Sequence, residues 1–319
     1  MKQVPIIDIQ SLSNPCTQQA KQQCVDAIYE GFSDIGFIAV FNHGIESSLL
    51  TQLREQVILL FNGCEKELLK LQVCKNNYRG YIPLGFFTPN AGKQAVDNYQ
   101  AFKLHQPIEK NNKLIQECDL YGHNVWPSHL PNLRPLVHEY WQQCLALGNK
   151  LLGAISEKID CFPDDWQELF VDSLSNMTLM HYPPSLGLDT NGIHPHKDTD
   201  VLTILAPDTV GGLQLRVRDN PQWVNVAVPP EALLINVGDM LETWTNGTLV
   251  STPHRVVRDA AQDRYSFPFF MVPRHDAIIT QWQGQQTVCE SAGSISRKIW
   301  YSNWPDAAAI ESHLDPYIN

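Results

Sequence analysis

The sequence predicts a mainly β protein with helices, in which an N-terminal helical part packs on a C-terminal double-sheet barrel or sandwich. From Ser175 onward, short apolar runs rich in Val, Ile, Thr and Phe recur at a spacing of about ten residues, which is typical of such β folds. Before that point, long segments carry apolar residues at helical spacing. Because no low-complexity linker separates the two parts, we expect one structural unit.

The individual elements follow from the same patterns. "VPIIDI" predicts an opening strand, residues 17–35 a helix, and "GFIAVFNHGI" a strand that ends in a turn at 42–44. Helices are expected over 46–71 and 133–159, with a glycine- and proline-rich break at "NNYRGYIPLG" between them. The strands predicted for the second half are "SNMTLMHY", "VLTILA", "GLQLRV", "WVNVAV", "ALLINVG", "VSTPHRVV", "RYSFPFFMV" and "AIITQW".

Composition excludes several classes of protein. The chain has 319 residues, 43% of them hydrophobic and 18% charged, as in ordinary globular proteins. Its net charge of -11 and the lack of a basic run argue against a nucleic-acid partner. The N-terminus has no secretory apolar region, no run approaches a membrane span, and the 8 cysteines form no CxxC pair. We therefore expect a cytoplasmic protein with reduced thiols and no membrane partner.

The segment "NGIHPHKDTDVLTIL" indicates a metal site. His196 and Asp198 are two positions apart, so they share one face of an extended segment. Two histidines and one carboxylate are the usual ligands of iron(II) in oxygen-activating enzymes. The third ligand must come from a neighbouring strand, and His254 in "STPHRVV" is the candidate. Taken alone, His254 would more often be a hydrogen-bonded histidine at a strand end.

A second polar pair follows ten residues later in "RYS". Arg264 and Ser266 lie on one strand face, and a guanidinium beside a hydroxyl suits a small carboxylate. The alternative is a surface arginine with an ordinary serine. Because the apolar run "FPFFMV" follows at once, an inward-facing Arg264 is expected, and an inward arginine needs an anion.

These motifs together resemble the iron(II)/2-oxoglutarate dioxygenases of the isopenicillin N synthase-like family. The resemblance rests on HxD, "GGLQL", "LLINVGDMLETWTNG", "STPHRVV" and "RYS", and in the first half on "VPIIDI", "GFIAVFNHGI", "YRGYIPLG" and "NVWP". The motifs occur in the family's order over nearly the whole chain.

The resemblance implies a double-stranded β-helix (jelly-roll) core over residues 175–275. Residues 1–160 would form an N-terminal helical and mixed region, and 276–319 a C-terminal strand and helix that close the same unit. Residue by residue, it implies His196, Asp198 and His254 as iron ligands. It implies Arg264, Ser266 and Tyr182 as residues that bind 2-oxoglutarate. One departure is Met180, where many relatives carry asparagine two residues before the tyrosine.

The activity that the resemblance implies is a 2-oxoglutarate-dependent oxygenase using Fe(II) and O2. It would hydroxylate, desaturate or cyclise a small organic molecule and release succinate and CO2. One alternative is a cosubstrate-independent iron oxidase of the isopenicillin N synthase type, in which Arg264 and Ser266 bind a substrate carboxylate. Another is a jelly-roll binding protein without catalysis, which the intact motif residues argue against.

The sequence is less informative on the substrate and the oligomeric state. Tyr81, Phe87 and Phe270 are candidate substrate contacts, as is the C-terminal "RKIWYSNW", although each aromatic residue is individually more often a core residue. His194 is expected to be a loop histidine, or else to lie at the mouth of the site. Asp200 is expected to be a solvated or backbone-capping residue, or else to meet a cationic group of the substrate.

Overall fold

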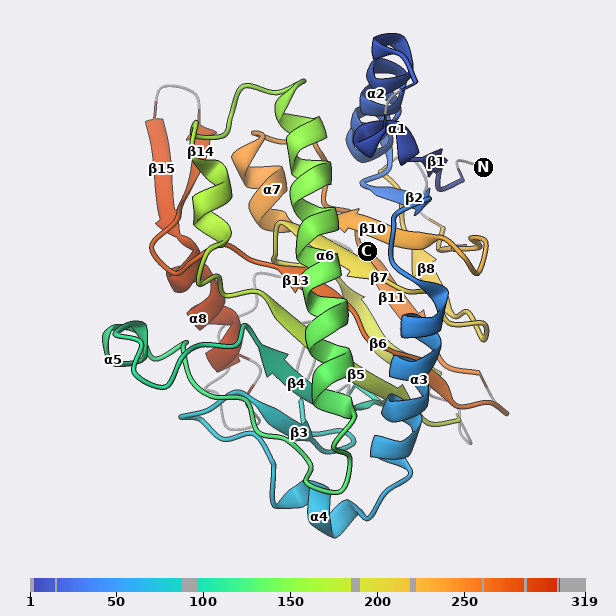
Figure 1. Cartoon of the computed structure of the whole chain (residues 1–319), viewed down its shortest axis with the longest axis vertical. Helices are drawn as coiled ribbons and strands as arrows, with labels where there is room; N and C mark the ends of the chain where they lie inside the picture. Colours follow the sequence, from blue (N-terminus) through green and yellow to red (C-terminus); the bar gives the residue numbers. More distant parts are fainter. Residues whose placement is uncertain are drawn as a thin grey trace.

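The chain folds around two β-sheets with a cavity between them, as a computed structural model shows (Figure 1). The structure describes residues 3–14, 16–87, 97–184, 190–218, 222–259, 261–283, 286–302 and 304. In this part of the chain the main sheet has nine strands. Their order is β1 (Ile6–Asp8), β2 (Phe37–Phe41), β10 (Leu233–Val237), β7 (Leu202–Leu205), β13 (Phe269–Met271), β5 (Asn176–Tyr182), β4 (Gln100–His105) and β3 (Gly80–Ile82), with β12 (Arg264–Ser266) also paired to β5.

The second sheet is smaller and supplies the opposite wall of the cavity. Its order is β6 (Asn191–His196), β11 (His254–Val257), β8 (Leu213–Leu215) and β9 (Val224–Asn225). A separate hairpin joins β14 (Ile278–Gln283) to β15 (Gln286–Ser291). This arrangement confirms the predicted mainly β fold with a jelly-roll core. The N-terminal strands β1 and β2 extend the main sheet through β10, so the core sheet also contains residues from outside 175–275.

Helices α2 (Gln18–Asp34), α3 (Ser47–Phe61) and α6 (Leu133–Ser156) pack on the main sheet. The other helices are α1 (Gln10–Ser13), α4 (Glu65–Leu69), α5 (Leu114–Glu117), α7 (Asp239–Trp244) and α8 (Ala292–Ser302), with a 3-10 turn over Trp166–Phe170. The long α6 runs across β7 and β13, and α3 packs on β5 and β12 (Figure 1). Gly148 permits the close approach of α6, because a Cβ there would lie 2.4 Å from the Met271 sulfur. None of the helices in these described ranges is long and apolar enough to cross a membrane.

Several elements of the structure differ from the predicted ones. The helix expected over 46–71 is two helices, because the chain breaks at Asn62 and Gly63 after α3. The strand expected in "RYSFPFFMV" is split into β12 and β13 by Pro268, which has no N–H for the sheet ladder. Strand β4 was not predicted: residues on both its faces are buried, so its sequence does not alternate.

Candidate active site

A cavity of about 310 Å³ lies between the two sheets. Its lining includes Thr178, Met180 and Tyr182 from β5 and His196 and His254 from the second sheet. This volume lies at the lower end of the range found for small-molecule sites. The cavity contains both polar groups that sequence analysis singled out, the His–Asp–His set and the arginine–serine pair.

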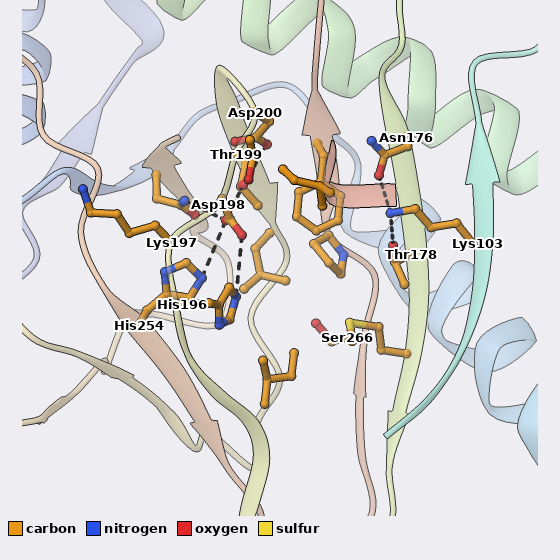
Figure 2. A pocket seen from close by; sticks show the side chains of 18 of the residues that line it. Lys103, Asn176, Thr178, His196, Lys197, Asp198, Thr199, Asp200, His254 and Ser266 are labelled. Atoms are coloured by element: carbon orange, nitrogen blue, oxygen red, sulfur yellow. Dashed lines mark hydrogen bonds and ion pairs between the residues drawn. The ribbon is translucent and has the colours of Figure 1, made fainter. Parts of the chain in front are cut away.

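His196, Asp198 and His254 converge on one point, as predicted (Figure 2). His196 ends β6 and His254 begins β11, and the two residues are directly paired in the antiparallel ladder. Their possible ligand atoms and those of Asp198 all lie within 4.8 Å of one another. The Asp198 oxygens are 3.7 Å from Nε2 of His196 and 3.6 Å from Nε2 of His254. Among the described residues, no other set of three His, Cys, Asp or Glu side chains has this geometry.

Backbone carbonyls orient the imidazoles of His196 and His254 so that Nε2 of each ring points toward Asp198. Nδ1 of His196 lies 2.8 Å from the carbonyl of His194, and Nδ1 of His254 lies 3.1 Å from that of Thr252. Because a carbonyl oxygen can only accept, each Nδ1 must carry the hydrogen. This hydrogen bond leaves Nε2 of each ring as the atom available to a metal, which is the arrangement that metal-binding histidines show. Burial lowers the pKa of His254, so its imidazole is neutral at neutral pH.

Asp198 is buried and held as a carboxylate. Its Oδ2 accepts hydrogen bonds from Thr203 Oγ1 at 2.6 Å and from Asn236 Nδ2 at 2.9 Å. Burial alone would raise its pKa, but the two histidines and these hydrogen bonds outweigh burial and leave the pKa below its ordinary value. Asp198 therefore offers its Oδ1 as an ionised ligand atom.

Asp198 does not lie on the same strand as His196, which corrects the sequence interpretation. Strand β6 ends at His196, and Asp198 is in the connection that follows. The first turn of α7 positions this connection, because Asp239 N–H donates to the Asp198 carbonyl at 2.7 Å and Met240 N–H to that of Asp200 at 3.1 Å. Gly238 lies so close that a Cβ there would be 2.2 Å from the Asp200 carbonyl oxygen. The side chain of Lys197 points away from the three ligands toward Glu242, 2.8 Å away (Figure 2).

Asp200 is buried, so the expected solvated position was wrong. Its Oδ2 lies 2.9 Å from Thr203 Oγ1, the same hydroxyl that contacts Asp198. Burial, together with the charge of Asp198, raises the pKa of Asp200 well above its ordinary value. A single hydroxyl hydrogen cannot serve both carboxyls. A protonated Asp200 that donates to Thr203, which in turn donates to Asp198, gives each of these two contacts its own hydrogen, while Oδ1 of Asp200 has no partner among the described residues.

Arg264 and Ser266 lie on β12 beside the cavity. Their ladder partners on β5 are Tyr182 and Met180, respectively. Arg264 is 3% exposed, its Nε donates to the Gly211 carbonyl at 2.8 Å, and its guanidinium carbon is 4.8 Å from the centre of the Tyr182 ring. Its Nη1 is buried and has no hydrogen-bond partner among the described residues. A buried guanidinium with an unpaired donor at a cavity wall fits an anionic ligand.

Tyr182 and Met180 complete this end of the cavity. The Tyr182 hydroxyl lies 3.3 Å from the Met180 sulfur, so a thioether is the polar neighbour of this hydroxyl. Burial raises the pKa of Tyr182 to about 12, and the phenol is therefore neutral. Tyr182 supports the Arg264 guanidinium with its ring face.

The predicted substrate contacts are only partly brought to the cavity. Phe87, Phe270 and, from the C-terminal segment, Trp300 line it. Tyr81 does not line the cavity. It pairs with Phe102 on β4, and since the next residue, Lys103, faces the cavity, Phe102 and Tyr81 lie on the opposite face of the sheet. The Tyr81 hydroxyl donates to Gln100 Oε1 at 2.7 Å. His194 is on β6 rather than in a loop, lines the cavity, and its Nδ1 lies 2.8 Å from Asp97 Oδ1.

Sequence reasoning missed one group of cavity residues, which lies on β4 and β5. Lys103 contacts Asn176 and Thr178 on the cavity wall opposite the three ligands (Figure 2). The only signal in the sequence was a lysine within a mostly apolar segment, "AFKLH". Because most lysines face water, this signal alone does not indicate a cavity residue.

The fold and the convergent His–Asp–His set define a jelly-roll protein with a metal site, and the comparisons with known proteins agree on this class of protein. Residues 174–273 match the model of the 2OG-Fe(II) oxygenase superfamily, and residues 4–129 match that of the non-haem dioxygenase in morphine synthesis N-terminal region.

Individual relatives are similar over most of their length. Azadirone synthase LFS of Melia azedarach is 32% identical over 279 residues, covering 84% of this chain and 82% of the relative. Gibberellin 2-beta-dioxygenase 8 of Arabidopsis thaliana is 29% identical over 280 residues, covering 87% and 76%. The crystal structure of JOX2 in complex with 2OG, Fe and JA is 25% identical with a TM-score of 0.76, covering 99% of this chain and 90% of that one.

The chain therefore belongs to the 2OG-Fe(II) oxygenase superfamily. It is an iron(II)- and 2-oxoglutarate-dependent dioxygenase, which confirms the main functional prediction and its cofactors. The comparisons do not support the cosubstrate-independent oxidase, since the relatives are 2-oxoglutarate-dependent enzymes.

Proposed function

We propose that His196, Asp198 and His254 bind the iron(II) of this dioxygenase, and that Arg264 and Ser266 bind the far carboxylate of 2-oxoglutarate. The observation that carries this assignment is the convergence of the three ligand atoms within 4.8 Å, with both histidines oriented by backbone carbonyls. Two imidazoles and one carboxylate are the donor set suited to non-haem iron(II), and they leave coordination positions open.

The unpaired Nη1 of Arg264 supports the second half of the assignment. Arg264 and the Ser266 hydroxyl are both buried and line the same cavity as the metal ligands, so one dicarboxylate can contact both groups. Tyr182 packs against the guanidinium, which makes Tyr182 a positioning residue for the cosubstrate.

Iron with 2-oxoglutarate and O2 supplies an oxidative decarboxylation to succinate and CO2, coupled to oxidation of a substrate C–H bond. The residues of the protein position the metal, the cosubstrate and the substrate. Thr203 and Asn236 donate hydrogen bonds that favour the ionised Asp198, and backbone carbonyls orient Nε2 of both histidines toward the metal position.

We further propose a small organic molecule as the substrate, which would be hydroxylated, desaturated or cyclised. The 310 Å³ cavity and the rings of Phe87, Phe270 and Trp300 at its wall support this. Nucleic acid is not expected as a partner, given the net charge of -11. The cytoplasmic location and the division into segments 1–160, 175–275 and 276–319 stay predictions.

Anaerobic titration of the purified protein with iron(II) and then 2-oxoglutarate tests the assignment. The expected results are one iron per chain and a visible charge-transfer absorption that appears only when both are present. Asp198→Ala should lose both the bound iron and the charge-transfer absorption. Arg264→Ala should keep its iron but lose the absorption at low concentrations of 2-oxoglutarate. Wild-type-like signals in Asp198→Ala would contradict the assignment.

A further inference from the structure

Lys103 places a second cation in the wall of the cavity. It lies on β4, is partly buried, and its Nζ donates to Asn176 Oδ1 at 2.6 Å and to Thr178 Oγ1 at 2.9 Å. Figure 2 shows it across the cavity from His196, Asp198 and His254. Neither the proposed iron site nor the proposed 2-oxoglutarate site uses Lys103.

The surroundings of Lys103 do not supply a counter-ion. Both hydrogen-bond partners are neutral, and the rings of Phe270 and Tyr78 lie 5.0 Å and 5.9 Å from Nζ. Among the described residues, no carboxylate forms an ion pair with it. Asp198 and Asp200 also line the cavity but form no ion pair with Lys103, and burial keeps His105, on the same strand, neutral.

A lysine in this environment favours an anionic ligand. Burial lowers the pKa of Lys103 to about 7, and the attraction of Asp198 and Asp200 offsets only part of this. Buried charges in proteins are otherwise paired or bound to a ligand. An anionic ligand beside Nζ would stabilise the charged ammonium form of Lys103.

The position of Lys103 separates it from the cosubstrate site. Tyr182, Met180, Thr178 and Asn176 alternate along one face of β5 and all line the cavity. Arg264 pairs with Tyr182, and Lys103 pairs with Thr178, four residues further along the strand. At about 3.3 Å per residue, the two positions are offset by roughly 13 Å along the direction of β5. The cavity can therefore hold 2-oxoglutarate at Arg264 and a second anionic ligand at Lys103, with the metal ligands on the opposite wall.

We propose that Lys103 binds a carboxylate of the organic substrate, so that the substrate of this dioxygenase is a small carboxylic acid with an apolar body. This proposal rests on the proposed function. The ammonium has three hydrogens, of which Asn176 and Thr178 accept two. The third, together with the Thr178 hydroxyl hydrogen, gives two donors for the two oxygens of a carboxylate. The rings of Phe87, Phe270 and Trp300 would contact the apolar body.

Binding of matched acids and amides tests the proposal without knowledge of the natural substrate. The probes are phenylacetate and cyclohexylacetate with their primary amides, measured by ligand-observed NMR on protein loaded with Zn(II) and saturating 2-oxoglutarate. Saturation with 2-oxoglutarate keeps the probes away from Arg264. Wild-type protein should bind each acid at least about tenfold more tightly than its amide, as expected for a charge-assisted contact.

Substitutions assign the preference to Lys103. Lys103→Met should abolish the preference for acids, Lys103→Arg should retain it, and Lys110→Met, at an exposed position, controls for the loss of one positive charge. Thermal unfolding checks that each variant is folded. If Lys103→Met does not fold, Thr178→Val removes one proposed donor and should weaken the preference severalfold.

Two results would overturn the proposal: a preference for acids that persists in Lys103→Met, or wild-type protein that binds acids no more tightly than amides. The affinity for 2-oxoglutarate, measured on the same samples, tests the proposed function separately. If the wild-type protein does not bind 2-oxoglutarate, the proposed cosubstrate site is contradicted. If it binds 2-oxoglutarate but does not prefer acids over amides, only the role of Lys103 is contradicted.

Discussion

His254 lies directly opposite His196 across the β6–β11 pair, with the centres of the two imidazole rings 4.3 Å apart. Both rings are fixed by a hydrogen bond from Nδ1 to the carbonyl two residues earlier in the chain. The strand ladder thus brings together two Nε2 atoms from residues that are far apart in sequence. Asp198 completes the set from the connection after β6.

This pairing predicts that each ligand is required for iron binding. His196→Ala, Asp198→Ala and His254→Ala should each lower the iron content at least about tenfold and abolish succinate production, because each removes one of three protein ligands. Circular dichroism should show an unchanged fold. Near-native turnover in any one of the three variants would remove that residue from the metal site.

Lys197 lies between two proposed ligands in sequence, but its side chain contacts Glu242 on α7. Lys197→Ala should leave the affinity for iron unchanged. It should cost at most about 1 kcal/mol of stability, because the ion pair is only partly buried. Iron titration and chemical denaturation measure the two effects. A large rise in the dissociation constant for iron would show that Lys197 faces the metal.

The contact between Gly238 and Asp200 predicts a backbone effect on the site. A methyl group in Gly238→Ala would lie 2.2 Å from the Asp200 carbonyl oxygen, so the connection that carries Asp198 must shift. We expect a loss of about 1–3 kcal/mol in stability, together with weaker iron binding. Gly153→Ala on α6, where a Cβ meets no atom within 4 Å, is the matched control and should be neutral or stabilising. Equal stability of the two variants would contradict the close packing.

The sequence contained the ligands and the arginine–serine pair because these residues occur in short motifs with a characteristic spacing. It did not reveal the burial of Asp200, since one aspartate after an HxD motif carries no signal for the fold around it. Lys103 was missed because β4 is covered on both faces and lacks alternation. Tyr81 was named as a candidate substrate contact but does not line the cavity, because the side that it faces depends on the tertiary pairing of β3 with β4.

The central claim is that the buried guanidinium of Arg264 binds the far carboxylate of 2-oxoglutarate, and titration of 2-oxoglutarate against the wild type and Arg264→Ala tests it most directly. Loss of a charge-assisted bidentate contact costs about 2–5 kcal/mol. At about 1.4 kcal/mol per tenfold, the Michaelis constant for 2-oxoglutarate should rise from tens- to thousands-fold. Iron affinity should be unchanged, because all three ligands remain. An unchanged Michaelis constant for 2-oxoglutarate in Arg264→Ala would contradict the account.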